Sequence, residues 1–395
     1  MGREEVKSIK DLDIDGKKVF IRCDFNVPLD KDGNISDERR IRETLPTIKY
    51  ALSRGAKIIL ASHLGRPKKR DPQYSLYPVA ENLSKALKKK VLFVDDCVGE
   101  KVEKTVSSMK KGDVILLENL RFYDGERRDD EVFARQLKRL FDIYVSDAFG
   151  TSHRRNASVH VLPKMCKEKA AGLLLLKEMG YWRKILENPA RPFALILGGV
   201  KISTKLGALI NLLDHLDKVI IGGGMAFTFL HAMGFSAGSS LFDEDSIEQA
   251  KFAISQAKDK KIKLYLPVDF VVAERIEEDA VTKIVPYQEI PCKWFAADIG
   301  PASCKLFSEV LEDTATIVWN GPLGVYEIDK FARGTNSIAH EVASSPAMSI
   351  VGGGDTDSAI KKAKESDGIT FISTGGGASL QFLEKGTLPG IEALE

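Results

Sequence analysis

The sequence predicts an α/β protein made of two doubly wound, Rossmann-like parallel-sheet domains joined by a helical hinge. Three observations support this prediction. The chain has 395 residues, whereas a single hydrophobic core rarely grows beyond about 250 to 300 residues. Short apolar runs, typical of buried strands, alternate along the whole chain with longer amphipathic stretches of helical spacing. Such alternation indicates parallel sheets with right-handed crossover connections.

The first half of the chain carries this pattern clearly. Short apolar runs bounded by polar or glycine-containing segments predict buried strands at residues 18–23, 57–61, 113–117 and 143–145. Between them, apolar residues recur three and four positions apart, which predicts helices at residues 37–53, 75–90 and 129–140. This half therefore has the elements of one complete parallel-sheet domain.

The second half repeats the pattern after a break. Strands are predicted at residues 193–197, 219–221, 262–266, 316–319 and 348–351, with a helix at residues 246–258. The break at residues 169–188 has helical spacing, interrupted at Gly180 and closed by Pro189, which is typical of a connector between domains. We therefore expect an N-terminal domain over residues 1–170 and a C-terminal domain over residues 171–395.

The composition argues against several classes of function. Lysines and arginines number 58 and nearly balance 56 aspartates and glutamates, so no global field attracts nucleic acid or anionic lipid. The five cysteines are scattered and never spaced as Cys-x-x-Cys, which disfavours a zinc site and favours a reducing compartment. No apolar run approaches the roughly 18 residues of a membrane span. We expect a cytoplasmic protein without nucleic-acid or membrane partners.

Polar side chains follow the predicted strands of the first half, where open parallel sheets bind their ligands. In order along the chain they are Asp24, Asn26, His63, Arg66, Arg121, His153 and Arg154. A lone arginine most simply forms a surface ion pair, but guanidinium groups at successive strand ends converge and match phosphate and carboxylate oxygens. This predicts a site for a small, strongly anionic phosphorylated acid. We assign the histidines binding roles only, while Asp24 and Asn26 either cap a turn or hold a ligand hydroxyl.

Glycine-containing turns follow the predicted strands of the second half instead. They stand at residues 198–199, 222–224, 320–324, 352–356 and 375–377. One such turn is weak evidence, but their recurrence lets backbone amides and helix N-termini approach phosphate groups, as a nucleotide site requires. The sequence contains neither a Walker motif nor G-x-G-x-x-G, because Phe227 stands where the third glycine after Gly222 is needed.

Charged residues beside these turns also suit phosphate binding. Lys201 and Lys205 are spaced i, i+4 after the first turn, so both ammonium groups could face phosphates beyond a strand end. Asp355 at a glycine-rich helix start is a candidate Mg²⁺ ligand, because Mg²⁺ usually takes one or two carboxylates together with phosphate oxygens. Asp355 is equally a candidate N-cap, and the two roles are compatible.

Segments spread along the chain resemble the signature motifs of a known family. They are RCDFNVP at residues 22–28, SHLGRP at 62–67, ENLRF at 118–122, DAFGT at 147–151, GGGMAFTF at 222–229, WNGPLGVYE at 319–327, GGGDT at 352–356 and STGGGAS at 373–379. In this order they resemble phosphoglycerate kinase over essentially the whole chain. Departures from the usual pattern stand at residues 155–156, 296–297 and 301–303, and Ala296 adds a methyl group at the wall of the family's adenine pocket.

The resemblance implies reversible phosphoryl transfer from 1,3-bisphosphoglycerate to MgADP, giving 3-phosphoglycerate and MgATP. By resemblance, the phosphoglycerate contacts Asp24, Asn26, Arg40, His63, Gly65, Arg66, Arg121 and Arg154. The nucleotide contacts Lys201, Lys205, Asn320, Pro322, Glu327, Gly353, Gly354, Asp355 and Thr356, with Glu327 on the ribose and Asp355 on the Mg²⁺ ion. The residues implied to face the transferring phosphoryl group are Arg40, Lys205, Gly353 and Gly376.

The implied in-line mechanism needs no catalytic base, because the carboxylate that attacks in the reverse direction is already ionised at neutral pH. Arg40, Lys205, Mg²⁺ and helix-terminal amides would instead stabilise charge in a loose transition state. Closure about residues 169–188 would bring the two substrates together. The resemblance also implies a monomer, and the last few residues can pack back on the N-terminal domain. Two alternatives stay open: a non-catalytic nucleotide-responsive protein on the same fold, and a kinase for another acyl phosphate.

Overall fold

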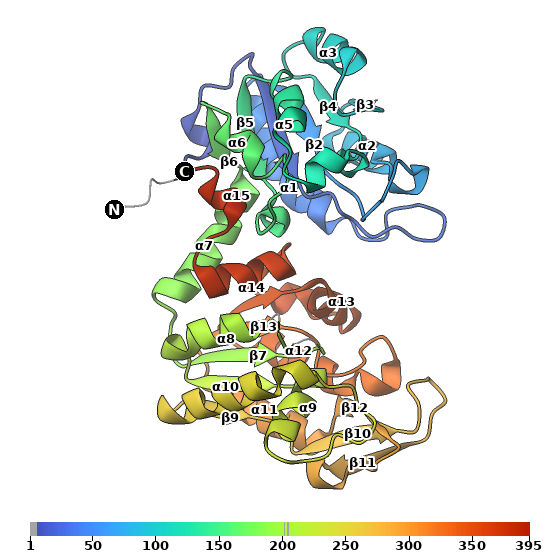
Figure 1. Ribbon diagram of the computed structural model, residues 1–395, viewed down its shortest axis with the longest axis vertical. Helices are drawn as coiled ribbons and strands as arrows, with labels where there is room; N and C mark the ends of the chain where they lie inside the picture. The colour runs from blue at the N-terminus through green and yellow to red at the C-terminus, as the bar shows by residue number, and fades with distance from the viewer. Residues whose placement is uncertain (1–5, 201, 204) are drawn as a thin grey trace. The chain divides into compact units, whose positions relative to one another are not determined.

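A computed structural model describes residues 6–200, 202–203 and 205–395 of the chain. The chain divides into two compact units (Figure 1). The first ends at Gly180 and also contains Thr387–Glu395, and the second is Tyr181–Gly386. Each unit has a parallel sheet flanked by helices, so the predicted α/β class is confirmed.

The described part of the first unit forms a six-stranded parallel sheet of order β3-β4-β2-β1-β5-β6. The strands are β1 (Lys18–Cys23), β2 (Lys57–Ala61), β3 (Val91–Val94), β4 (Val114–Leu117), β5 (Ile143–Asp147) and β6 (Lys169–Ala171). The helices are α1 (Arg39–Ser53), α2 (Tyr77–Leu87), α3 (Glu100–Ser107), α4 (Asp124–Arg127), α5 (Glu131–Lys138), α6 (Val161–Lys164) and α15 (Pro389–Glu392). The sequence missed β3 and β6, which lie at the sheet edges and are short.

The described part of the second unit also forms a six-stranded parallel sheet, of order β15-β14-β13-β7-β8-β9. The strands are β7 (Phe193–Leu197), β8 (Lys218–Ile221), β9 (Lys263–Tyr265), β13 (Thr316–Asn320), β14 (Met348–Gly352) and β15 (Phe371–Ile372). The helices are α8 (Leu206–Leu212), α9 (Gly223–Ala232), α10 (Ile247–Asp259), α11 (Pro301–Leu311), α12 (Arg333–Ser344), α13 (Gly354–Lys362) and α14 (Gly376–Lys385).

The second unit also contains a small antiparallel sheet, whose strands were not predicted from the sequence. Its strands are β10 (Asp269–Ala273), β11 (Thr282–Pro286) and β12 (Phe295–Ile299), in the order β11-β10-β12. Most of β11 is exposed to solvent, so its sequence lacks the apolar run by which buried strands are predicted.

Helix α7 (Leu173–Glu187) runs from the first unit into the second, and the division at Gly180 falls inside it rather than just before it. The helix begins within the first unit because its amide groups are bonded there: Leu173 N donates to Thr47 Oγ1 at 2.9 Å. The C-terminal segment is held in the first unit as well, since Lys169 Nζ donates to Ala393 O at 2.9 Å and Gly390 N donates to Ser152 O at 2.8 Å.

Asp147 binds the start of α7 from the end of β5. Its Oδ1 accepts hydrogen bonds from the amides of Leu174 (2.9 Å) and Leu175 (3.1 Å). Burial raises the pKa of Asp147 to about 7, although these hydrogen bonds act in the opposite direction. The folded state therefore keeps a proton that the unfolded chain loses near pH 4, so the stability linked to this group is lost as the pH rises from about 4 to about 7.

We expect Asp147→Asn to flatten this pH dependence. Asparagine keeps an acceptor oxygen but no charge, so the stability of the variant relative to the natural chain should rise with pH, by at most about 1.4 kcal/mol per unit. Thermal unfolding of both proteins at several pH values between 4 and 8 measures this difference. Replacement of the exposed Asp32 by asparagine is the control, and a difference for Asp147→Asn that is constant with pH would contradict the prediction.

Candidate active site

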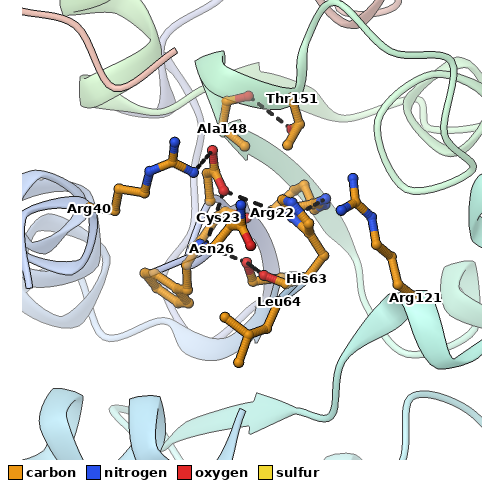
Figure 2. Close-up of polar contacts among 12 residues, drawn as sticks. Arg22, Cys23, Asn26, Arg40, His63, Leu64, Arg121, Ala148 and Thr151 are labelled. Carbon is orange, nitrogen blue, oxygen red and sulfur yellow. Dashed lines mark hydrogen bonds and ion pairs between the residues drawn. The ribbon is translucent and has the colours of Figure 1, made fainter. Parts of the chain in front are cut away.

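The carboxyl ends of β1, β2 and β5 lie level in the first sheet, since Arg22 pairs with Ala61 and Cys23 pairs with Asp147. Parallel pairing therefore brings the segments after these strands to one edge. Figure 2 shows the result: Arg40, Asn26 and His63 gather around the end of β1, and Arg121 approaches from the far side of His63.

Asp24 lies buried at this edge and forms an ion pair with Arg40, whose Nη1 is 2.8 Å from Asp24 Oδ2. Burial alone would favour the neutral acid. The positive charges of Arg40 and Arg22 outweigh that effect, however, and lower the pKa of Asp24 to about 2. Asp24 is thus a fixed anion that orients Arg40, and it can accept a hydrogen bond from a ligand hydroxyl.

His63 is buried beside Asp24, with Nδ1 3.8 Å from Asp24 Oδ1. Burial lowers its pKa well below the ordinary value, and the nearby arginines reinforce this effect against the charge of Asp24. The imidazole is therefore neutral at physiological pH. A neutral ring suits the predicted binding role rather than proton transfer.

Asn26 and Arg121 both hold the turn at Gly65. Asn26 Oδ1 accepts a hydrogen bond from Gly65 N at 2.7 Å, and Arg121 Nη1 donates to Gly65 O at 2.5 Å. Gly65 has a φ of +63°, and a Cβ atom there would overlap the ring of Tyr74. The Asn26 side chain thus has a definite structural task, in addition to any contact with a ligand.

Three arginines besides Arg40 carry positive charge on this edge, and we call Arg66, Arg121 and Arg154 the arginine cluster. Burial, together with the charges of Arg154 and Arg22, lowers the pKa of Arg121 to about 10. Burial likewise lowers the pKa of Arg154, and the charge of Arg66 adds to this effect. Such mutual repulsion is relieved by a bound polyanion, so the cluster has the electrostatics of a phosphate and carboxylate site.

The sequence interpretation gave no role to a buried network beneath this edge. Arg22 is 1% exposed, its Nε donates to Ser158 Oγ at 2.7 Å, and its Nη2 lies 3.7 Å from Glu126 Oε1. Nη2 also lies 3.4 Å from His63 Nδ1. An arginine within the buried apolar run of the strand KVFIRC was the signal that could have revealed this network.

The glycine turns of the second unit pack directly against each other. A Cβ atom at Gly198 would overlap the backbone of Pro322 and Gly321, and a Cβ atom at Gly376 would overlap the backbone of Gly353. Gly353 itself has a φ of +106°, a conformation that side chains disfavour. The absence of side chains therefore serves close packing and also leaves backbone amides near the strand ends.

Asn320, Pro322 and Thr356 are tied to these turns. Pro322 O accepts a hydrogen bond from Gly199 N at 2.8 Å. Thr356 Oγ1 accepts one from Gly321 N at 2.7 Å and donates to Gly352 O at 3.1 Å. The buried Asn320 side chain lies beside Gly352 and Gly353. These residues hold the turns of β13 and β14 together.

Lys205 is buried among the same turns, whereas Lys201 lies outside the described residues. The Lys205 ammonium group donates to the carbonyl oxygens of Gly198 and Asn320, the latter at 3.2 Å. Burial lowers its pKa to about 8, and the negative charge of Asp355 partly offsets this effect. A cation so poorly solvated gains strongly from a phosphate nearby.

The exposed residues of this edge are available to a ligand. Gly354 and Asp355 form the first turn of α13, whose N-cap is Gly353, so Asp355 is not the N-cap. Asp355 is exposed to solvent. Glu327 is also exposed, and its backbone carbonyl accepts a hydrogen bond from Lys362 Nζ at 2.9 Å.

This chain is similar to known proteins over nearly its whole length. The family model described as phosphoglycerate kinase matches residues 9–386. The phosphoglycerate kinase of Nitratiruptor sp. is 57% identical over 99% of this chain and 98% of its own length, and that of Aquifex aeolicus is 53% identical over 97% and 96%. A solved structure of phosphoglycerate kinase from Coxiella burnetii is 40% identical, covers 99% of both chains and has a TM-score of 0.87.

Proposed function

Because this chain belongs to the phosphoglycerate kinase family, we propose that its first unit binds the phosphorylated three-carbon acid and its second unit binds the nucleotide. The enzyme transfers a phosphoryl group reversibly from 1,3-bisphosphoglycerate to ADP, giving 3-phosphoglycerate and ATP. The observation that supports this assignment is the presence of the arginine cluster at the edge of the first unit's sheet and of the glycine turns at the edge of the second unit's sheet.

The acid-binding residues are proposed from the first edge. The arginine cluster holds the phosphate and carboxylate groups, because guanidinium groups match both bidentately. Asp24 and neutral His63 hydrogen-bond the polar groups between them, while Asn26 and Gly65 shape the turn. Arg40 faces the transferring phosphoryl group. The buried pair Arg22 and Glu126 supports this arrangement from below.

The nucleotide-binding residues are proposed from the second edge. Lys201 and Lys205 contact phosphates, Asn320, Pro322 and Thr356 shape the turns, and Glu327 binds the ribose. The amides of Gly353, Gly354 and Gly376 reach phosphate oxygens at the starts of α13 and α14. Asp355 would hold Mg²⁺, which requires few protein carboxylates and would neutralise charge on the nucleotide phosphates.

Direct transfer requires the two bound molecules to meet and water to leave, so we propose that the units close about α7 when both substrates are present. We expect the radius of gyration to fall in small-angle scattering with 3-phosphoglycerate and a non-hydrolysable ATP analogue together, but not with either alone. No decrease with both ligands would rule out closure as the way the substrates meet.

A coupled turnover assay tests the activity itself. The purified chain with MgATP should phosphorylate 3-phosphoglycerate and leave acetate unchanged, because acetate offers nothing to the arginine cluster. Turnover of acetate would indicate a kinase for another acyl phosphate, and nucleotide binding without turnover would indicate a binding protein. Omitting Mg²⁺ should abolish turnover. We further propose that the protein is a cytoplasmic monomer. Among the described residues, no helix is long and apolar enough to cross a bilayer.

A further inference from the structure

Three side chains outside the assigned sites form a line of hydrogen bonds in the first unit. Asp129 Oδ2 is bonded to Nδ1 of His160, and His160 Nε2 lies 2.7 Å from Lys164 Nζ. A carboxylate at Nδ1 fixes the ring proton there and leaves the lone pair of Nε2 to face the amine. In enzymes, nucleophilic side chains are activated by this arrangement, in which an acid orients a base and the base contacts the nucleophile.

The local backbone holds these groups in place. Asp129 has a φ of +55°, and its second oxygen, Oδ1, accepts a hydrogen bond from Val161 N at 3.2 Å. Val161 begins α6, a single helical turn that ends at Lys164. His160 and Lys164 are therefore four positions apart on the same side of this turn, where side chains meet.

The three side chains differ in solvent exposure: the acid and the base are largely buried, and the lysine is exposed, as a reactive lysine requires. The side chains of Asp129 and His160 are only 22% and 14% exposed, whereas Lys164 is exposed. The base is thus shielded from water while the amine can be reached by a reagent. Within the described ranges no carboxylate lies at ion-pair distance from Lys164 Nζ, so His160 is the acceptor in place for its proton.

Lysine charges act on the segment that follows Lys164. The charges of Lys138 and Lys169 act on the thiol of Cys166, where they oppose the larger effect of burial, which raises the pKa of this thiol to about 11. Lys167 and Glu168 are both exposed close by in sequence. Local positive charge attracts anionic reagents and favours the departure of an anionic leaving group.

From this geometry we propose that Lys164 is an acyl-acceptor site for acyl phosphates, activated by His160 and Asp129. Lys164 gives one proton to His160 Nε2, and the free amine attacks the carbonyl carbon of the donor. The C–N bond forms as the C–O bond to phosphate breaks; the departing phosphate takes the second proton from nitrogen, and His160 returns the first to water. The lysine becomes a neutral amide.

The experiment uses the full chain with acetyl phosphate as donor and peptide mass spectrometry as readout. We expect Lys164 to be acetylated about tenfold faster than Lys167, the internal reference, because a positioned base accelerates proton transfer. His160→Ala and Asp129→Asn should each reduce the rate at Lys164 to that of Lys167, and the rate at Lys167 should not change. Circular dichroism and kinase turnover equal to those of the natural chain verify that both variants are folded.

Equal rates at Lys164 and Lys167 in the natural chain would overturn the proposal, and so would a fast rate at Lys164 that survives both substitutions. A parallel reaction with acetyl-CoA distinguishes the donor class: labelling of Lys164 as rapid as with acetyl phosphate would overturn the selectivity for acyl phosphates. Because acylation is measured by mass rather than by turnover, failure here leaves the kinase assignment intact.

Discussion

Replacing Arg40 by alanine is expected to lower kcat about a thousandfold and to weaken the binding of 3-phosphoglycerate far less. The Arg40 side chain is 29% exposed and is held by Asp24 at 2.8 Å, so it is both oriented and accessible. Its proposed contact with the phosphoryl group should strengthen in the transition state, where negative charge spreads over the equatorial oxygens. Steady-state turnover together with calorimetric binding separates the two effects.

Arg42→Ala is the matched control, because Arg42 lies on the same helix but is exposed. It should keep the kcat of the natural chain. Loss of Arg40 also leaves Asp24 buried without its closest cation, so thermal unfolding must verify that the Arg40 variant is folded. An unchanged kcat in Arg40→Ala would remove this residue from the mechanism.

Replacing Lys205 by methionine is expected to lower kcat at least about a hundredfold, since the variant loses the desolvated cation that we propose lies beside the nucleotide phosphates. The pH profile gives a second test. With a pKa of about 8 in the free enzyme, Lys205 loses its charge above that pH, so kcat/KM for the nucleotide should fall at higher pH. This fall should be absent from the residual activity of the methionine variant.

Lys258→Met is the control for this substitution, because Lys258 is an exposed lysine of the same unit on α10. Its turnover and pH profile should match those of the natural chain. If Lys205→Met kept the alkaline fall in kcat/KM, that titration would belong to another group. If it kept the natural kcat as well, the buried ammonium group would serve only the packing of the turns.

Some site residues could be found by reasoning from strand ends, and others could not. Asp24, His63 and Arg121 come shortly after the ends of β1, β2 and β4, so the expected direction of the sheet was enough to place them on one edge. Arg40 lies at the start of α1 and was assigned through family resemblance, since a helix position reveals nothing about which strand end it faces. The network of Arg22, Glu126 and Ser158 was not predicted, because its contacts join segments far apart in sequence.

The sequence by itself determined the α/β class, most strands of both parallel sheets and the family, because apolar periodicity and short motifs are local properties of a chain. Only the tertiary structure decided that Asp24 is ionised, that His63 is neutral and that the pKa of Lys205 is about 8. It also decided that the backbones of Gly353 and Gly376 meet. These properties depend on the exclusion of water and on distances between remote segments, which form only when the sheets assemble.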